Sequence, residues 1–333
     1  MEFETSNEKQ RTTNPLVSVI VITYNSSNYV LETLESAKAQ IYQNIELIVS
    51  DDCSTDITVD VCRKWIEENK SRFVRTELIT ISINTGIPAN CNRGLEASEG
   101  EWVKFIAGDD TMGKDCISFF INKVFSLHEE VHALHSEMNK YLKSFSRTNF
   151  KFTAPRSQEP FNHPEILAGE QLSILVRRIM CPYGPTSFIK RATLELLGGF
   201  DINLPFEDGP MWYNFVRNGF KIHYLNKAVV NYRYHNSVSH SLDEKYIFNP
   251  YYKQDKIVFN KLYKKHLFLF EVVSWSLSYR FMDFFSKYGW NNRTPLNSFL
   301  FNLVEWPNSK FRAFTNMLII ANINNKLARR KNF

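Results

Sequence analysis

Short apolar runs alternate with amphipathic segments along the first third of the chain. The runs are rich in Val, Ile and aromatic residues, which favours strands buried on both faces. They cover residues 17–22, 45–49, 78–83 and 102–106. Between them apolar residues recur at helical spacing, which predicts helices within 26–39, around 59–66 and over 88–97. This alternation predicts a doubly wound α/β domain with a mostly parallel sheet over residues 15–113.

The middle of the chain is less regular. Residues 119–175 carry little periodic signal, and 155–164 are predicted to form a loop. The pattern then predicts a strand at 187–189, a helix at 192–197, an amphipathic helix that follows Asp208 and ends at Asn218 and Gly219, and an alternating strand at 229–234.

The C-terminal region, residues 242–333, is aromatic and basic. Its pattern predicts helices over 259–270, 271–285 and 311–327. Residues 241–333 carry a net charge of +9 and the rest of the chain −4. Such a helical appendage suits an anionic membrane surface. Packing of these helices on the rest of the chain or on a second copy is an equal alternative.

We therefore expect three parts. Residues 1–14 form a loose polar arm, 15–241 the main domain, and 242–333 the helical region. Within the main domain we expect two halves, residues 15–113 and 114–241.

Composition restricts the setting of the protein. The five cysteines form no CxxC pair, which argues against a disulfide framework and a zinc site. The N-terminal segment lacks the apolar core of a signal peptide, and no later segment has about eighteen uninterrupted apolar residues. These features predict a cytoplasmic protein. Peripheral contact with the inner face of the cell membrane and a homo-oligomer stay open, and no nucleic-acid partner is expected.

Adjacent carboxylates follow two of the predicted strands, Asp51 and Asp52 after the second and Asp109 and Asp110 after the fourth. Ligands bind at this edge of an open α/β sheet, where paired acids can hold a divalent cation that binds phosphate. The competing interpretation of Asp109 and Asp110 is that they start the next helix, and Asp51 could serve only the loop. Neither G-x-G-x-x-G nor GxxxxGK[ST] is present, which excludes a dinucleotide-binding Rossmann site and a P-loop.

Five motifs in order carry a resemblance to a known family. VSVIVITYN, DDCSTD, the NTG…NRG segment, GDD, and FED followed by MW and NGF span about residues 15–241. Together they resemble the family 2 glycosyltransferases with a GT-A fold, which implies a doubly wound, mostly parallel sheet flanked by helices. The resemblance also implies that residues 15–113 are the nucleotide-sugar-binding half and 114–241 the acceptor-side half.

The resemblance also implies a reaction. It predicts an inverting, metal-dependent hexosyl- or N-acetylhexosaminyltransferase. The donor would be a nucleotide-sugar, with a UDP-sugar favoured, and the acceptor a hydroxyl of a saccharide or lipid-linked saccharide. The expected setting is bacterial capsule, lipopolysaccharide or exopolysaccharide synthesis. The alternative is a catalytically inactive relative that binds or scaffolds.

The nucleotide site implied by the resemblance consists of Thr23, Tyr24, Asn25, Asp52, Arg93 and Asp109. The end of the first strand would pack the base, with the Tyr24 ring available for stacking. Asp52 would accept the uracil imide N–H, and Asp109 would reach the ribose or the metal shell. Tyr24 could instead close the core, and Arg93 could be an exposed helix residue.

The metal site implied by the resemblance holds Mn²⁺ or Mg²⁺ with Asp110 and His235 as ligands. The family pattern has a further acid two places ahead of the Asp pair, where this chain has Ala107. Coordination would then depend on diphosphate oxygens and water. A plain surface histidine is the competing interpretation of His235.

The acceptor side implied by the resemblance consists of Glu207, Asp208 and Trp212. Asp208 is the predicted catalytic base, with Glu207 and Trp212 as acceptor contacts. Because acids are common at helix N-termini, capping is the competing role for Glu207 and Asp208.

Overall fold

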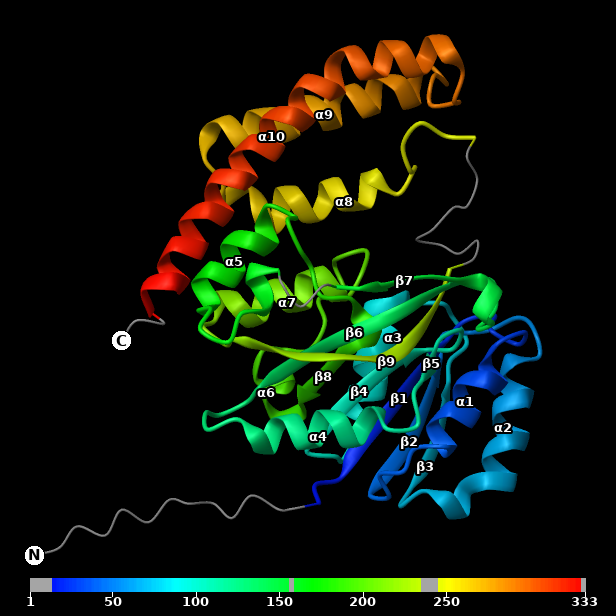
Figure 1. Ribbon diagram of the computed structural model, residues 1–333. Helices are drawn as coiled ribbons and strands as arrows, with labels where there is room; N and C mark the ends of the chain where they lie inside the picture. Colours follow the sequence, from blue (N-terminus) through cyan, green and yellow to red (C-terminus); the bar gives the residue numbers. More distant parts are fainter. Residues whose placement is uncertain (1–13, 156–158, 235–244, 331–333) are drawn as a thin grey trace, which may run out of the picture.

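The computed structural model describes residues 14–155, 159–234 and 245–330. These residues form a nine-stranded sheet in the order β3-β2-β1-β4-β8-β6-β9-β5, with β7 paired to β6. Helices cover the sheet, and the last three helices form a separate layer beyond it (Figure 1). The fold is of the predicted α/β class.

The first half has the predicted alternation. The strands β1 (Val17–Thr23), β2 (Ile45–Asp51), β3 (Thr76–Thr80) and β4 (Trp102–Ala107) are parallel, and they alternate with α1 (Val30–Lys38), α2 (Thr58–Asn69) and α3 (Ile87–Glu96). The predicted third strand, 78–83, was placed too late. β3 ends at Thr80, because Thr80 pairs with Asp51, the last residue of the neighbouring strand β2.

The second half contains the predicted elements from residue 187 onward and, before them, structure that the periodicity missed. It comprises β5 (Thr111–Met112), α4 (Cys116–Ser126), β6 (Ala133–Leu142), β7 (Phe150–Ala154), α5 (Ala168–Val176), β8 (Ser187–Lys190), α6 (Arg191–Leu196), α7 (Asp208–Arg217) and β9 (Ile222–Tyr234). The strand β8 is antiparallel to both β4 and β6, so the sheet is mixed here. β6 lies between β8 and β9, although its sequence, ALHSEMNKYL, is largely polar.

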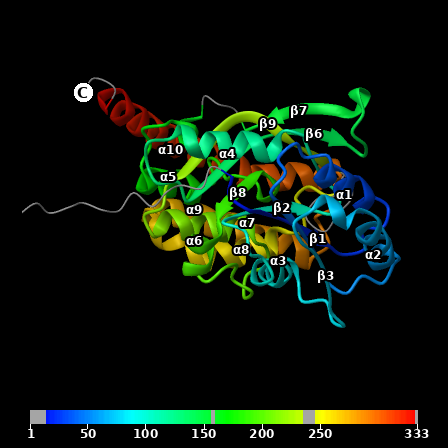
Figure 2. The same cartoon turned by 90° about the horizontal axis from the view of Figure 1, so that it is seen from below.

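Apolar side chains form a core on each face of the sheet. One core contains Val17, Val19 and Val21 of β1 together with residues of α1, α2 and α4. The other contains Ile20 of β1 and residues of α3, α5, α6 and α7. Figure 2 shows α4 and α6 on opposite sides of β8. Strands buried on both faces explain the near-continuous apolar runs in the sequence.

The C-terminal helices are α8 (Tyr252–Val258), α9 (Leu269–Lys287) and α10 (Pro295–Arg330). A π-helical turn (Phe259–Tyr263) and a 3₁₀ turn (Lys264–His266) follow α8. The predicted helix 259–270 is wrong at its end. Leu267 and Phe268 are extended, and Glu271 accepts the Phe268 N–H at 2.9 Å to begin α9.

The inner side of this region packs on the main domain. Phe259, Tyr279 and Ile323 belong to the same core as α5 and α7. The buried guanidinium of Arg177 donates to both carboxylate oxygens of Glu271, at 2.8 and 3.0 Å. Packing on the main domain is therefore confirmed for the inner side. The predicted boundary at 241/242 lies outside the described residues, between β9 and α8.

Within the described ranges, none of the helices combines the length and the apolar character needed to span a bilayer. The C-terminal helices are amphipathic, with one packed side and one exposed side.

Candidate active site

The candidate site lies at the carboxyl edge of the first four strands. β1 pairs with β2 on one side and β4 on the other, so the chain direction of the connections reverses around β1. Such a switch point opens a crevice at the strand ends. The ends of these three strands are Thr23, Asp51 and Ala107, and the predicted nucleotide and metal residues follow directly.

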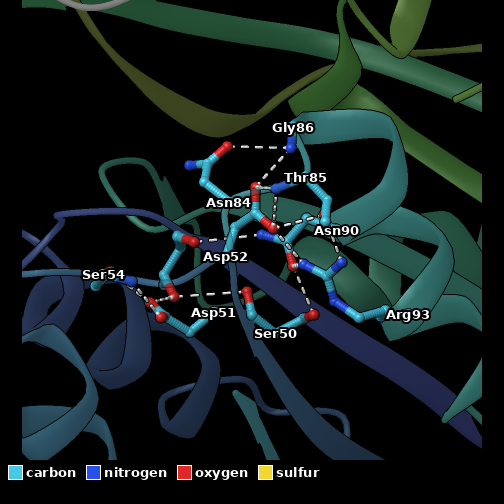
Figure 3. A network of polar contacts seen from close by, with 10 residues as sticks. Ser50, Asp51, Asp52, Ser54, Asn84, Thr85, Gly86, Asn90 and Arg93 are labelled. Carbon is cyan, nitrogen blue, oxygen red and sulfur yellow. Dashed lines mark hydrogen bonds and ion pairs between the residues drawn. The ribbon is translucent and has the colours of Figure 1, made fainter. Parts of the chain in front are cut away.

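Asp52 is buried in a network of donors (Figure 3). Its carboxylate accepts the N–H groups of Thr85 and Gly86, at 3.1 and 2.7 Å, and the Thr85 hydroxyl at 2.8 Å. The Arg93 guanidinium donates to Asp52 at 2.6 Å and to the side chain of Asn90 at 3.1 Å. The carboxylate of Asp52 thus fixes the turn before α3. The N–H of a bound nucleobase, the predicted partner of Asp52, would have to share oxygens that already accept hydrogen bonds.

Asp51 has a structural environment of the same kind. Its oxygens accept the Thr23 hydroxyl at 2.8 Å, and the Ser54 N–H and hydroxyl at 2.8 and 2.6 Å. Asn25, in the left-handed region with φ of 50°, accepts the Thr55 N–H at 2.8 Å. These bonds hold the loop after β2 against the end of β1.

The structure does not support the competing interpretations of Tyr24 as a core residue and of Arg93 as an exposed helix residue. The Tyr24 side chain is 45% exposed, so it does not close the core and its ring is available at the strand end. The Arg93 side chain is only 20% exposed, because it lies along Asp52 rather than in solvent. Both residues are therefore at the predicted nucleotide side of the crevice.

The Asp109–Asp110 turn is clamped by β9. The backbone N–H of Arg233 donates to a carboxylate oxygen of Asp110 at 2.8 Å, and the guanidinium of Arg233 donates to the Asp109 carbonyl at 2.8 Å. From the other side, the Thr33 hydroxyl of α1 donates to the Asp110 carbonyl at 2.7 Å. Asp110 is buried and Asp109 is partly exposed. Neither Asp110 nor Asp109 begins a helix, so the capping alternative fails here.

Asp110 has one unsatisfied oxygen. Its Oδ2 atom is buried and accepts no hydrogen bond from a described residue. Burial and the charge of Asp109 raise the pKa of Asp110 well above its usual value. A buried carboxylate oxygen without a donor is suited to a cation. However, no three His, Cys, Asp or Glu side chains of the described ranges gather as a metal site. The predicted ligand His235 lies outside the described residues.

Glu207 and Asp208 form a second acidic pair at the start of α7. Glu207 occupies the N-cap position without a side-chain capping bond, so its capping alternative is not supported. Asp208 accepts the N–H of Gly209 at 2.6 Å. Burial and the charge of Asp208 raise the pKa of Glu207 to about 8, and burial raises the pKa of Asp208.

The turn at 184–186 approaches this pair closely. A Cβ on Gly184 would lie 3.0 Å from a Glu207 carboxylate oxygen, so glycine permits the approach. The fully buried ammonium of Lys104 donates to the carbonyls of Phe105 and Pro185, which ties this turn to β4. Burial lowers the pKa of Lys104 to about 8. Lys104 therefore holds the turn at 184–186 against the acidic pair.

Both acidic pairs act on the same tyrosine. Burial and the negative charges of Asp110, Asp109 and Asp208 raise the pKa of Tyr232, on β9. The contacts agree: Asp110 accepts the N–H of Arg233, the residue after Tyr232, and Tyr232 shares the Lys140 ammonium with Tyr183, which precedes the Gly184 turn at Glu207 and Asp208. The fold therefore brings acids that are about a hundred positions apart in sequence to one place.

A cation lies beside Tyr232. The ammonium of Lys140, on the neighbouring strand β6, is 4.3 Å from the Tyr183 ring centroid and 5.7 Å from that of Tyr232. Burial lowers the pKa of Lys140. Lys140 and Tyr232 lie beside the site, and the sequence did not single them out. β6 shows no clear period, and in β9 only the alternation of the strand was recognised.

Trp212 does not lie at the acceptor side. Its side chain is completely buried, with 0% exposure, and packs against Phe215 in the core. The structure therefore corrects the predicted acceptor contact of Trp212. The spacing of Met211, Trp212 and Phe215 on α7 was the sequence signal of a core face. Arg233 was also missed, because a lone arginine in a strand has no distinctive pattern.

The assembled site offers carboxylates that can take a cation or a proton. Asp109 and Asp110 offer oxygens for a cation, and Asp208 offers a carboxylate with a raised pKa. A general base works best when its pKa approaches the working pH. Perturbed carboxylates in a crevice are typical of functional sites.

Three comparisons with known proteins agree with this geometry. The family model described as "Glycosyl transferase family 2" matches residues 18–133. WfaP of Escherichia coli, a "UDP-Glc:alpha-D-GlcNAc-diphosphoundecaprenol beta-1,3-glucosyltransferase", is 29% identical over 223 residues, which cover 66% of this chain and 78% of that protein. An uncharacterized glycosyltransferase of Haemophilus influenzae is 34% identical over 114 residues, which cover 34% of this chain and 44% of that protein.

A solved structure has the same fold. The crystal structure of residues 1–349 of Staphylococcus aureus TarS in complex with UDP superposes with a TM-score of 0.52 at 25% identity, and covers 66% of this chain and 60% of that one. The chain thus spans less than two thirds of this relative and of the H. influenzae protein. On its motifs, its sheet topology and these similarities, the chain has a GT-A fold and resembles the family 2 glycosyltransferases, whose model matches residues 18–133.

Proposed function

We propose that this chain is an inverting, metal-dependent glycosyltransferase that moves a hexosyl or N-acetylhexosaminyl group from a UDP-sugar to a hydroxyl of a saccharide or lipid-linked saccharide. The observation that carries the proposal is the Glu207–Asp208 pair at the start of α7. Its carboxylates have raised pKa values, and the charge of Asp208 acts on the same tyrosine as those of Asp109 and Asp110.

Asp208 is the proposed base. It removes the proton from the acceptor hydroxyl while that oxygen attacks the anomeric carbon from the face opposite the leaving UDP. Glu207, with a pKa of about 8, keeps its proton at neutral pH and can donate a hydrogen bond to the acceptor. General-base assistance of this kind is typically worth ~10²–10⁴ in rate.

Mn²⁺ or Mg²⁺ is the proposed cofactor. Asp109 and the unsatisfied oxygen of Asp110 are the carboxylates that would hold it, with His235 as a further candidate. The cation would supply Lewis-acid stabilisation of charge on the diphosphate. Since Ala107 replaces one family acid, the diphosphate and water would complete the shell. Arg233 keeps both acids in place, whether or not a cation is bound.

The donor and acceptor classes are supported by the relatives. WfaP is named for a UDP-Glc donor and a diphosphoundecaprenol acceptor, and TarS is in complex with UDP. In this chain, the exposed ring of Tyr24 and the Asp52–Arg93 pair line the corresponding strand ends. We extend the nucleotide and the lipid-linked acceptor class to this chain on that basis, in surface-polysaccharide synthesis on the cytoplasmic side.

A thermal-shift titration tests the nucleotide. The full chain is heated with UDP, GDP, CDP or TDP, each with Mn²⁺ or with EDTA. A ligand at about 100 times its Kd adds roughly 2.7 kcal/mol of stability. We expect UDP with Mn²⁺ to stabilise the protein and UDP with EDTA to do so much less. Stabilisation by GDP alone would contradict the donor assignment.

The alternative is an inactive relative that binds or scaffolds. It is favoured by one observation, the absence of the family acid at Ala107. Turnover separates the two functions. If UDP and Mn²⁺ bind but UDP-sugars are neither transferred nor hydrolysed with any saccharide or prenyl-diphosphate acceptor tested, the inactive relative is the better description.

A further inference from the structure

The outer side of the α9–α10 hairpin exposes an unusual amount of apolar surface. Of the thirty-one large hydrophobic side chains that are exposed in the described ranges, seventeen lie in residues 268–318. In Figure 1 these two helices form the outermost layer, with α8 between α9 and the catalytic domain. Large contiguous apolar patches on a protein surface indicate an interaction site.

The exposed side chains follow one face of each helix. On α9, Val273, Leu277 and Phe284 are 43–49% exposed and recur at a spacing of four and seven residues. On α10, Phe299 and Leu303 are 58–60% exposed and are four residues apart. This spacing places each set on a single helix face, away from the packed side. We call these two faces together the hairpin outer face.

The faces of the two helices are continuous. The Phe270 and Phe311 rings, one from each helix and both exposed, meet edge to face with centroids 5.7 Å apart. Polar and buried residues line the opposite side, where Ser278 of α9 donates to Glu305 of α10 at 2.6 Å. The hairpin is thus held together by polar contacts inside and presents its apolar residues outward.

The charge of the hairpin is one-sided as well. Its three acids are all engaged in ion pairs: Glu271 with Arg177, Asp283 with Lys256, and Glu305 with Arg312. In contrast, the exposed cations Arg280, Lys287 and Lys310 form no ion pair with any residue in the described ranges. Lys287 lies 5.6 Å from the Tyr288 ring and Lys310 lies 5.8 Å from the Trp306 ring.

We propose that the hairpin outer face docks the enzyme on an anionic lipid bilayer, with both helices lying in the interface. Aromatic and aliphatic side chains would enter the boundary between headgroups and acyl chains, and the unpaired cations would contact anionic headgroups. Long basic side chains reach headgroups while their stems stay apolar. Docking in the plane agrees with the lack of a membrane-spanning helix among the residues described.

A second copy of the chain fits this face less well. In a two-fold dimer the same patch meets itself, which would bring Arg280, Lys287 and Lys310 toward their own copies. Lysine is also depleted from the cores of protein interfaces. An anionic bilayer satisfies both the apolar residues and the cations.

Docking has a consequence for the active site. The turn after α8 lies beneath α9, and a Cβ on Gly209 would come 2.9 Å from the Tyr263 hydroxyl of that turn. Gly209 follows the proposed base Asp208. The hairpin therefore reaches the acidic pair through α8, and a docked enzyme would hold this pair near the bilayer surface. The docking itself does not rest on the proposed transfer reaction.

Vesicle flotation of the full chain tests the proposal without any substrate. Vesicles of phosphatidylcholine alone are compared with vesicles that also contain phosphatidylglycerol. We expect binding to the anionic vesicles at low salt and its loss at high salt. Neutralising Arg280, Lys287 and Lys310 to glutamine should weaken partitioning roughly 5-fold for each charge. Equal binding of the triple variant and the wild type would overturn the proposal.

The apolar part of the proposal has its own variants. Leu303→Ser and Phe299→Ser should each weaken partitioning roughly 10-fold. Leu196→Ser is the matched control, because Leu196 is 75% exposed on α6 of the catalytic domain, and it should partition like the wild type. All variants change exposed side chains, and a wild-type melting temperature and UDP response verify that each is folded.

Light scattering distinguishes the alternative occupant. A dimer that becomes monomeric in Leu303→Ser and Phe299→Ser, together with no vesicle binding by the wild type, would assign the face to a second copy. A wild-type monomer that floats with neither kind of vesicle would also overturn the proposal. Failure of the UDP titration would leave the vesicle result unaffected, so the two proposals fail separately.

Discussion

The carboxylates at the carboxyl edge of the sheet fall into two groups. Asp51 and Asp52, after β2, accept several short hydrogen bonds from hydroxyl, amide and guanidinium donors of the protein. Asp110, Glu207 and Asp208 instead have raised pKa values, and Asp110 has a buried oxygen without a donor. The protein itself supplies hydrogen-bond donors to the first group. The second group has fewer such donors and can interact with a ligand.

This difference separates structural from chemical roles. A carboxylate that accepts donors in the folded state stabilises that state, and its loss leaves those donors unpaired. A buried carboxylate with a raised pKa costs stability when it ionises, so its presence indicates function. The comparison therefore predicts that substitutions in the first group affect folding, and those in the second group affect ligands and turnover.

The largest expected effect is that of Asp208→Asn. Removing the base should lower kcat by ~10²–10⁴-fold while UDP binding is retained. Steady-state kinetics with UDP-sugar and a thermal shift with UDP and Mn²⁺ measure the two quantities. Asp60→Asn, at a side chain that is 78% exposed, is the control. Wild-type turnover in Asp208→Asn would remove this residue from the proposed role.

Asp52→Asn should come next, as a loss of stability. The amide cannot pair with the Arg93 guanidinium as the carboxylate does, and its NH₂ group would face donors from Thr85 and Gly86. We expect roughly 2–4 kcal/mol less free energy of unfolding, measured by urea denaturation. Unchanged stability with lost UDP binding would show that Asp52 acts on the ligand, as the carboxylates of the second group do, and not on folding.

Asp110→Asn tests the metal site with a smaller effect. The substitution keeps the shape of the side chain and removes the charge beside its unsatisfied oxygen. We expect Mn²⁺-dependent UDP binding to weaken roughly 10-fold, since metal-site changes typically cost 10–100-fold. Isothermal titration with and without EDTA measures this. If Asp109→Asn weakens binding and Asp110→Asn does not, the partly exposed Asp109 is the ligand and Asp110 only supports it.

Glu207→Gln should show the smallest effect, in the pH dependence of stability. The folded-state pKa of Glu207, about 8, lies above its usual 4.5, so folding favours the protonated form. Its contribution is therefore fully present at low pH and is lost as pH rises through about 8. Glutamine cannot ionise, so the variant should gain roughly 1 kcal/mol over the wild type between pH 6 and pH 9, after allowance for solvent exposure of the pair. A stability difference that does not change with pH would contradict the raised pKa.

The first half of the fold could be predicted because each residue pattern is compatible with only one type of secondary structure. The runs VSVIVIT and IELIVSD can hardly form amphipathic helices, and the segments between them can hardly form buried strands. The parallel order then follows from the handedness of the connections. β6 was not readable, since its polar residues are paired by neighbours that are distant in sequence, such as Glu137 with the Tyr224 hydroxyl at 2.6 Å.

The sequence by itself determined the class of fold, the order of the strand-end acids and the resemblance to the family 2 glycosyltransferases. It did not determine which acids are paired. Asp52 and Asp110 each follow a buried strand as one of two adjacent aspartates, yet only the tertiary structure brings Arg93 and the 85–86 turn to Asp52 and leaves one oxygen of Asp110 without a donor. The physical reason is that the energy of a carboxylate depends on the donors and charges within a few ångströms, and these come from elements far apart in the chain.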